Sequence, residues 1–184
     1  MTAAARAAER LDKLALMHVP TWTRPSSIKG AAMACRELRL CEYHKELGFG
    51  SMRKYSKARF GRSWLANGLS YYDMAAENLP YFHRLWKAGV ISPRKLSACG
   101  RMIGPTTAWF WLPLLIHLRP IELLLVAANE RKALRGVAGG AVFVPLWLPR
   151  RWWQRHWAPR DNGESGWKII QAMIAEARGG EEAV

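Results

Sequence analysis

The stretch from Ser51 to Arg101 constrains the fold most strongly, because apolar residues with a helical period recur there between closely spaced turn residues. Gly61 and Gly89 suit the left-handed conformation that ends a helix, and Ser92-Pro93 is typical of a helix start. The stretch therefore predicts four short helices in succession. We expect an all-α fold with a compact multi-helix domain.

The first two of these helices are predicted to be joined by a very short turn. Residues 51–60 place Met52, Tyr55 and Phe60 near one helical face, and Gly61 is expected to end that helix. Ser63 is expected to cap the next helix, which should run from about residue 64 to 77. Two helices joined so tightly resemble a helix-turn-helix, which we place at about residues 51–77.

The second predicted helix has an apolar side and an outward side. The expected core residues are Leu65, Leu69, Tyr72 and Ala76, and the expected outward residues are Trp64, Asn67, Gly68 and Tyr71. In a DNA-binding helix-turn-helix the first outward residues of this helix meet base edges, and Asn is suited to adenine. This helix is therefore predicted to face the groove of a duplex.

Basic residues dominate the charge of the chain. Twenty-eight Lys and Arg against fourteen Asp and Glu give a formal net charge of +14, which favours polyanionic partners such as nucleic acid or acidic lipid. The predicted DNA contacts in this region are Arg53, Lys54, Lys57, Arg59 and Arg62 on phosphates, with Trp64, Asn67 and Tyr71 toward the groove.

Several motifs in a fixed order resemble a known family. The first two motifs are residues 48–55 (Gly-Phe-Gly-Ser-Met-Arg-Lys-Tyr) and 60–63 (Phe-Gly-Arg-Ser). The third is residues 79–96, a segment that contains Leu79-Pro80 and Gly89-Val-Ile-Ser92. Together they resemble the helical region that precedes the nuclease domain in bacterial HNH endonuclease proteins, over roughly residues 36–134. The resemblance implies a helical DNA-binding region. No His-Asn-His constellation follows, so the nuclease activity is not carried over.

The chain around this stretch divides into further parts. Residues 1–27 are predicted to be an N-terminal arm and linker, and residues 28–135 the helical domain. A helix over 28–47 is expected to bury Cys35 and Cys41 and to carry His44 on its surface.

The apolar residues 106–118 and 120–134 predict two buried helices, since neither run is long enough to span a membrane. A segment lying on a membrane is the alternative.

Residues 136–184 are predicted to be a basic, Trp-rich extension. The run from 149 to 160 interleaves Arg with Trp and holds no acid, so Arg150, Arg151 and Arg155 are predicted to form a second phosphate-binding patch. Two alternatives are a lipid interface and packing of the Trp side chains back onto the domain. Residues 167–178 predict a final amphipathic helix, and residues 141–148 a short strand or extended segment.

These features together predict a non-catalytic protein that binds double-stranded DNA. No cofactor, metal site or small-molecule substrate is predicted, and the three cysteines match no common zinc or disulfide spacing. We expect reduced thiols, a cytoplasmic location and, as an open option, a homodimer. The alternative is a helical adaptor whose basic, Trp-rich face binds a protein partner or an acidic membrane surface.

Overall fold

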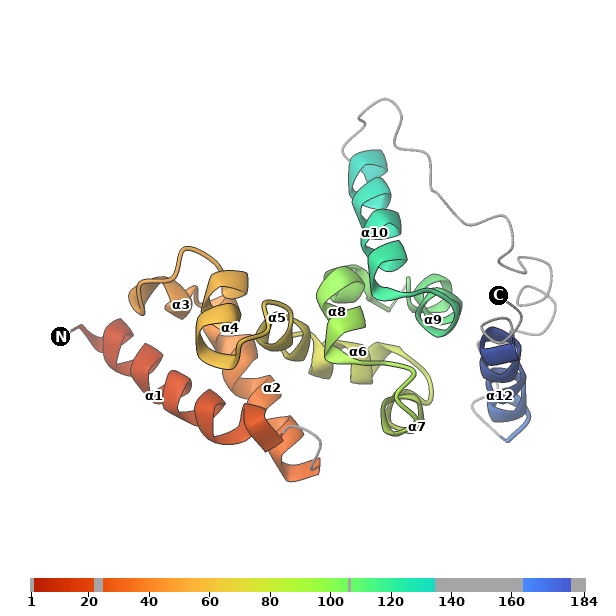
Figure 1. Cartoon of the computed structure of the whole chain (residues 1–184), viewed down its shortest axis with the longest axis horizontal. Helices are drawn as coiled ribbons and strands as arrows, with labels where there is room; N and C mark the ends of the chain where they lie inside the picture. The colour runs from red at the N-terminus through yellow and green to blue at the C-terminus, as the bar shows by residue number, and fades with distance from the viewer. Residues whose placement is uncertain (1, 22–24, 106, 135–163, 180–184) are drawn as a thin grey trace. The chain divides into compact units, whose positions relative to one another are not determined.

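The structure is a computed structural model that describes residues 2–21, 25–105, 107–134 and 164–179 (Figure 1). Within these ranges every regular element is a helix, so the all-α prediction is confirmed for them. The chain divides into two compact units, Met1–Ala75 with Ser92–Arg101, and Ala76–Ile91 with Met102–Val184. The predicted extended segment at 141–148 and the Arg- and Trp-rich run at 149–160 lie outside the described residues.

The first unit begins with two helices that lie side by side (Figure 1). Its elements are α1 (Ala3–His18), η1 (Val19–Thr21), α2 (Pro25–Leu40), α3 (Tyr43–Glu46), α4 (Met52–Phe60), α5 (Leu65–Leu69), the start of α6 (Tyr72–Asn78), and α8 (Pro93–Cys99). The Thr2 hydroxyl caps α1 by accepting a bond from the Ala5 amide at 3.1 Å. Ala8, Asp12 and Ala15 are buried, so the predicted N-terminal arm is a packed part of this unit.

The predicted helix over residues 28–47 is two helices. The backbone of Glu42 takes a left-handed conformation with φ of 54°, and this breaks the helix between α2 and α3. Cys35 is buried as expected, but Cys41 is exposed. His44 is buried, with its Nδ1 atom 2.9 Å from the Leu38 carbonyl oxygen. The predictions of a buried Cys41 and a surface His44 are therefore wrong, because both assumed an unbroken helix.

Most of the predicted helix ends are confirmed. Ser92 caps α8 through its hydroxyl group, and Gly61 and Gly89 have φ of 70° and 73°. Ser51, which was not predicted as a cap, caps α4 in the same way. Ser63 is an exception, because the residue preceding α5 is Trp64 and its side chain makes no capping hydrogen bond.

The predicted second helix at 64–77 is broken. It consists of α5 and α6, which are separated at Ser70 and Tyr71. The Ser70 hydroxyl donates to the Asn67 carbonyl at 2.7 Å, and the Tyr71 amide donates to the Gly68 carbonyl three residues back. Because α5 packs closely on α8, a Cβ atom on Gly68 would lie 1.8 Å from the Pro93 carbonyl oxygen. The prediction of one continuous helix here is wrong.

The second unit contains the apolar helices of the later chain. It comprises the end of α6, α7 (Phe82–Lys87), α9 (Ala108–His117), α10 (Pro120–Leu134) and α12 (Glu164–Gly179), and the short η2 (Gly100–Met102) lies at the unit boundary. Trp111 of α9 is buried, and Ile170 and Met173 of α12 are buried where α12 packs on α9. The two predicted apolar helices and the final helix are therefore confirmed.

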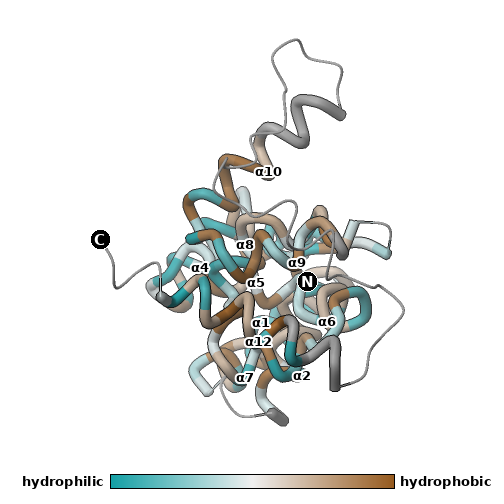
Figure 2. Tube along the Cα trace, turned by 90° about the vertical axis from the view of Figure 1, so that its right-hand side faces the viewer, coloured by the Kyte–Doolittle hydropathy of each residue, from teal (hydrophilic) through white to brown (hydrophobic). Residues whose placement is uncertain are grey.

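One face of α10 is not buried. Leu123 and Val126 are buried, whereas Ile121, Leu124 and Leu125 are 59%, 44% and 55% exposed. Figure 2 shows the first turns of α10 as strongly hydrophobic. The prediction of a buried helix is therefore confirmed for Leu123 and Val126 and wrong for Ile121, Leu124 and Leu125. Among the described helices, none has the length and apolar character required to cross a bilayer.

Candidate nucleic-acid interface

Helix α4 is held in the first unit by buried residues on one of its faces. Met52, Tyr55 and Ser56 are buried there. The Tyr55 ring makes edge contacts with Phe49 and Phe60, with ring centroids 5.5 Å and 5.9 Å away. The opposite face of α4 is consequently presented to solvent in a fixed orientation.

A polar network joins α4 to α1. The Tyr55 hydroxyl donates to Asp12 Oδ1 at 3.0 Å, and the Arg59 guanidinium lies 2.7 Å from Asp12 Oδ2. Burial, followed by the negative charge of Asp12, raises the pKa of Tyr55 well above its usual range. The phenol therefore remains protonated and able to donate, and the network fixes α4 on α1.

The exposed face of α4 carries positive charge only. Arg53, Lys54 and Lys57 are all exposed, and at 3.6 residues per turn they lie within an arc of about 100°. No acidic residue occurs in the sequence between Glu46 and Asp73. Arg59 is also exposed but lies outside this arc, on the side that meets Asp12.

The exposed Arg62 continues this surface into the turn that follows α4. We call Arg53, Lys54, Lys57 and Arg62 the cationic face. Within the described part of the chain, no carboxylate lies within the 4.0 Å ion-pair distance of any of these four side chains. Lys57 Nζ donates to the Gly61 carbonyl at 3.2 Å, which places its ammonium group beside the turn. The charge of the cationic face is therefore not neutralised by any described acid.

The turn between α4 and α5 is fixed by the buried Ser56. Its hydroxyl donates to the Arg62 carbonyl and accepts from the Ala66 amide at 3.0 Å. The Arg62 guanidinium lies over the Trp64 ring, 5.6 Å from the centroid. These contacts hold the turn, and with it Arg62, next to α4.

The residues predicted to face the DNA groove occupy different environments. Trp64 is half-buried, and Asn67 donates through its side-chain amide to the Ser97 hydroxyl at 3.0 Å on α8. Tyr71 is buried, and the Arg39 guanidinium covers its ring at 4.3 Å. Gly68 is buried against Pro93. The prediction that Gly68 and Tyr71 point outward is wrong, because α8 and α2 pack on that side.

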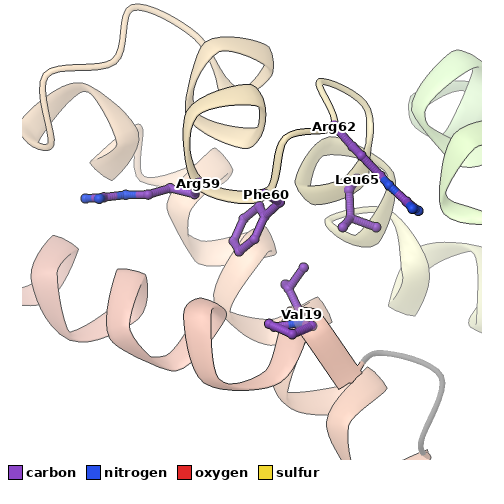
Figure 3. Close-up of a pocket in the computed structure, with 6 residues that line it drawn as sticks. Val19, Arg59, Phe60, Arg62 and Leu65 are labelled. Atoms are coloured by element: carbon purple, nitrogen blue, oxygen red, sulfur yellow. The ribbon is translucent and has the colours of Figure 1, made fainter.

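A hollow lies next to the cationic face. It has a volume of about 390 Å³ and is lined by Val19, Pro20, Arg59, Phe60, Arg62 and Leu65. Figure 3 shows the side chains of Phe60 and Leu65 pointing toward Val19, while Arg59 and Arg62 extend away from it on opposite sides. The hollow thus lies between two guanidinium groups, and the half-buried Phe60 ring is part of its lining.

The structure does not describe the other predicted site residues. Arg150, Arg151 and Arg155 lie outside the described residues. Among the residues that the structure describes, no group of three or more His, Cys, Asp and Glu side chains is arranged to hold a metal ion. Cys35, Cys41 and Cys99 are free thiols.

Comparisons with known proteins give no relative for this chain. No family model matches it, and no curated protein or solved structure matches it either. The resemblance to the helical region of HNH endonuclease proteins therefore stays a prediction.

Two residues that organise this surface were missed by the sequence analysis. Asp12 lies at a helical spacing with Ala8 and Ala15, which are both buried. A carboxylate on the same helix face as two buried alanines indicates that the carboxylate is itself buried and paired with a cation. The sequence therefore contained a signal for the role of Asp12. Ser56 gave no such signal, since its role depends on Arg62 and Ala66 folding back over it.

Proposed function

We propose that this protein binds double-stranded DNA through the backbone phosphates, without a catalytic step. The cationic face supplies the contacts, and α4, the turn and α5 form the helix-turn-helix of this proposal. Phosphate contacts from Lys and Arg release counterions from the duplex, and this supplies most of the affinity when binding is independent of sequence.

One observation carries the proposal. The cationic face is exposed on a rigidly anchored helix, and no described carboxylate neutralises it. Exposed cations on a protein surface are commonly interspersed with acids, which lowers the local potential. Here the uninterrupted positive charge matches a polyanion better than it matches a mixed protein surface.

Recognition of base sequence has less support in this arrangement. Asn67 is engaged with Ser97, and Tyr71 is buried under Arg39. Helix α5 has only five residues, which is short for a recognition helix that enters the major groove. We therefore propose binding that tolerates many sequences. Trp64 at the turn is half-buried and lies beside the Arg62 guanidinium.

The basic, Trp-rich run at 149–160 adds a second part to the proposal. Arg150, Arg151 and Arg155 would contact further phosphates, and the indole rings between them would stack on bases that are exposed. This part rests on the sequence pattern alone.

Fluorescence anisotropy with a labelled duplex of two helical turns, roughly 20 base pairs, tests the proposal. We expect the full chain to bind several unrelated duplexes with similar affinity, and the logarithm of the affinity to fall steeply with the logarithm of the salt concentration. Failure to bind any duplex at low salt would refute it.

A second candidate function is favoured by the exposed apolar face of α10. Ile121, Leu124 and Leu125 follow an i, i+3, i+4 spacing and would suit an adaptor that binds a protein partner or a membrane surface. Sedimentation with anionic vesicles, compared with zwitterionic ones, tests this alternative. Retention on anionic vesicles together with no binding to duplex DNA would replace the DNA proposal.

A further inference from the structure

The hollow beside the cationic face is a second feature that a nucleic acid would meet. Its lining includes Val19 and Leu65, which are almost completely buried and offer little surface to a ligand, and the half-buried Phe60 ring, which offers more. The volume of about 390 Å³ falls within the range of roughly 300–1,000 Å³ found for ligand pockets. A flat group that entered the hollow would therefore meet the Phe60 ring.

The charges around the hollow differ in their availability. The Arg59 guanidinium is already held by Asp12 at 2.7 Å. Arg62 has no described carboxylate partner and lies over Trp64. Arg62 is therefore the cation at the rim that is best able to bind an incoming anion.

We propose that the hollow receives one unpaired base of a bound nucleic acid, with Arg62 on the phosphate next to it. The Arg62 charge at the rim and the Phe60 ring in the lining match the two halves of a nucleotide, since a base has a flat stacking face and its backbone carries a negative phosphate. This inference rests on the proposed function, because Arg62 belongs to the cationic face that would hold the duplex. It adds a preference for DNA with an unpaired base.

The test compares three labelled duplexes of identical length. One is fully paired, one has a single unpaired dT in the middle, and one has an abasic residue at that unpaired position. The last two carry the same phosphates, so any difference between them comes from the base. We expect the full chain to bind the unpaired dT duplex about tenfold more tightly than the abasic one.

Substitutions at two lining residues locate the effect. Phe60→Leu removes the ring but keeps an apolar side chain, and it should abolish the preference for the unpaired base while leaving the affinity for paired duplex unchanged. Pro20→Glu adds a negative charge at an exposed lining residue, and Pro20→Lys is its matched control. The Glu variant should lose the preference, and the Lys variant should keep it. Thermal melts verify that each variant is folded.

The two proposals fail in different ways. Equal affinity for the unpaired dT and abasic duplexes, with normal binding of paired duplex, would overturn the inference and leave the proposed function standing. A preference that survives both Phe60→Leu and Pro20→Glu would also overturn it, because the base would then bind elsewhere. Absence of binding to all three duplexes would overturn both proposals.

Discussion

The Arg59 guanidinium lies 2.7 Å from the Asp12 carboxylate and joins α4 to α1. Asp12 also accepts the hydrogen bond from Tyr55, so one carboxylate fixes two residues of α4. Of the five cations predicted to contact phosphate in this region, Arg59 is the one that pairs with an acid among the described residues. We infer that Arg59 positions α4, while the cationic face binds the ligand.

Replacing Asp12 by Asn should destabilise the fold while preserving the cationic face. The amide still accepts from Tyr55 but leaves Arg59 without a counterion, and we expect a loss of about 1–3 kcal/mol in the free energy of unfolding. Urea denaturation measures this loss. The adjacent, exposed Lys13→Gln is the control and should change stability by less than about 0.5 kcal/mol. Equal stability of the two variants would show that the Asp12 network contributes nothing.

Gly68 should tolerate no larger residue. Alanine is a better helix former than glycine by up to about 1 kcal/mol, so Gly68→Ala would be stabilising on helix propensity alone. The new Cβ atom, however, would lie 1.8 Å from the Pro93 carbonyl oxygen, and α5 and α8 would have to separate. We expect a net loss of about 2 kcal/mol or more, seen as a lower melting temperature. Gly50→Ala is the matched control and should melt near the parent temperature, since its new Cβ would meet no atom within 4 Å beyond its chain neighbours.

The three cysteines should differ sharply in reactivity toward a thiol reagent such as Ellman's reagent. Cys41 is exposed, whereas Cys35 and Cys99 are buried. Burial raises the pKa of both buried thiols to about 12, so neither forms the reactive thiolate in the native protein at neutral pH. Native protein should therefore react at one thiol and denatured protein at three. Fast labelling of the Cys41→Ala variant in its native state would contradict this arrangement.

Stability should fall in alkaline solution. The Cys35 and Cys99 thiols ionise in the unfolded chain near their ordinary pKa of 9.0 but stay neutral in the folded protein up to about pH 12. The unfolded state therefore loses protons first, and the free energy of unfolding should decrease by roughly 1.4 kcal/mol per pH unit for each thiol across that window. Urea denaturation at increasing pH measures this slope. Cys35→Ala should reduce the slope.

The sequence predicted best those features that depend on residues close together in the chain. The cap at Ser92 and the left-handed Gly61 and Gly89 were predicted correctly, because each is decided within one turn of helix. The exposed cations of α4 were found for the same reason, since Met52 and Tyr55 define the buried face.

Two of the errors come from helix breaks that the sequence pattern did not reveal. A continuous helix over 64–77 would carry Tyr71 outward, but the close approach of α5 to Pro93 and the break after Leu69 bury it instead. The left-handed backbone of Glu42 breaks the predicted helix over 28–47, so Cys41 is exposed and His44 is buried, the reverse of the prediction. Helical periodicity cannot locate such breaks when no Pro or Gly marks them.

The salt dependence of duplex binding tests the central claim most directly when two triple variants are compared. One variant replaces Arg53, Lys54 and Lys57 by Gln, and the other replaces the exposed Lys13, Lys29 and Lys87 by Gln. Both lose three positive charges, so overall charge is matched. We predict that the first variant loses affinity and that its salt slope falls by about 0.9 for each phosphate contact removed, while the second stays close to the parent protein. The same loss in both variants, or in neither, would contradict the assignment of DNA binding to α4.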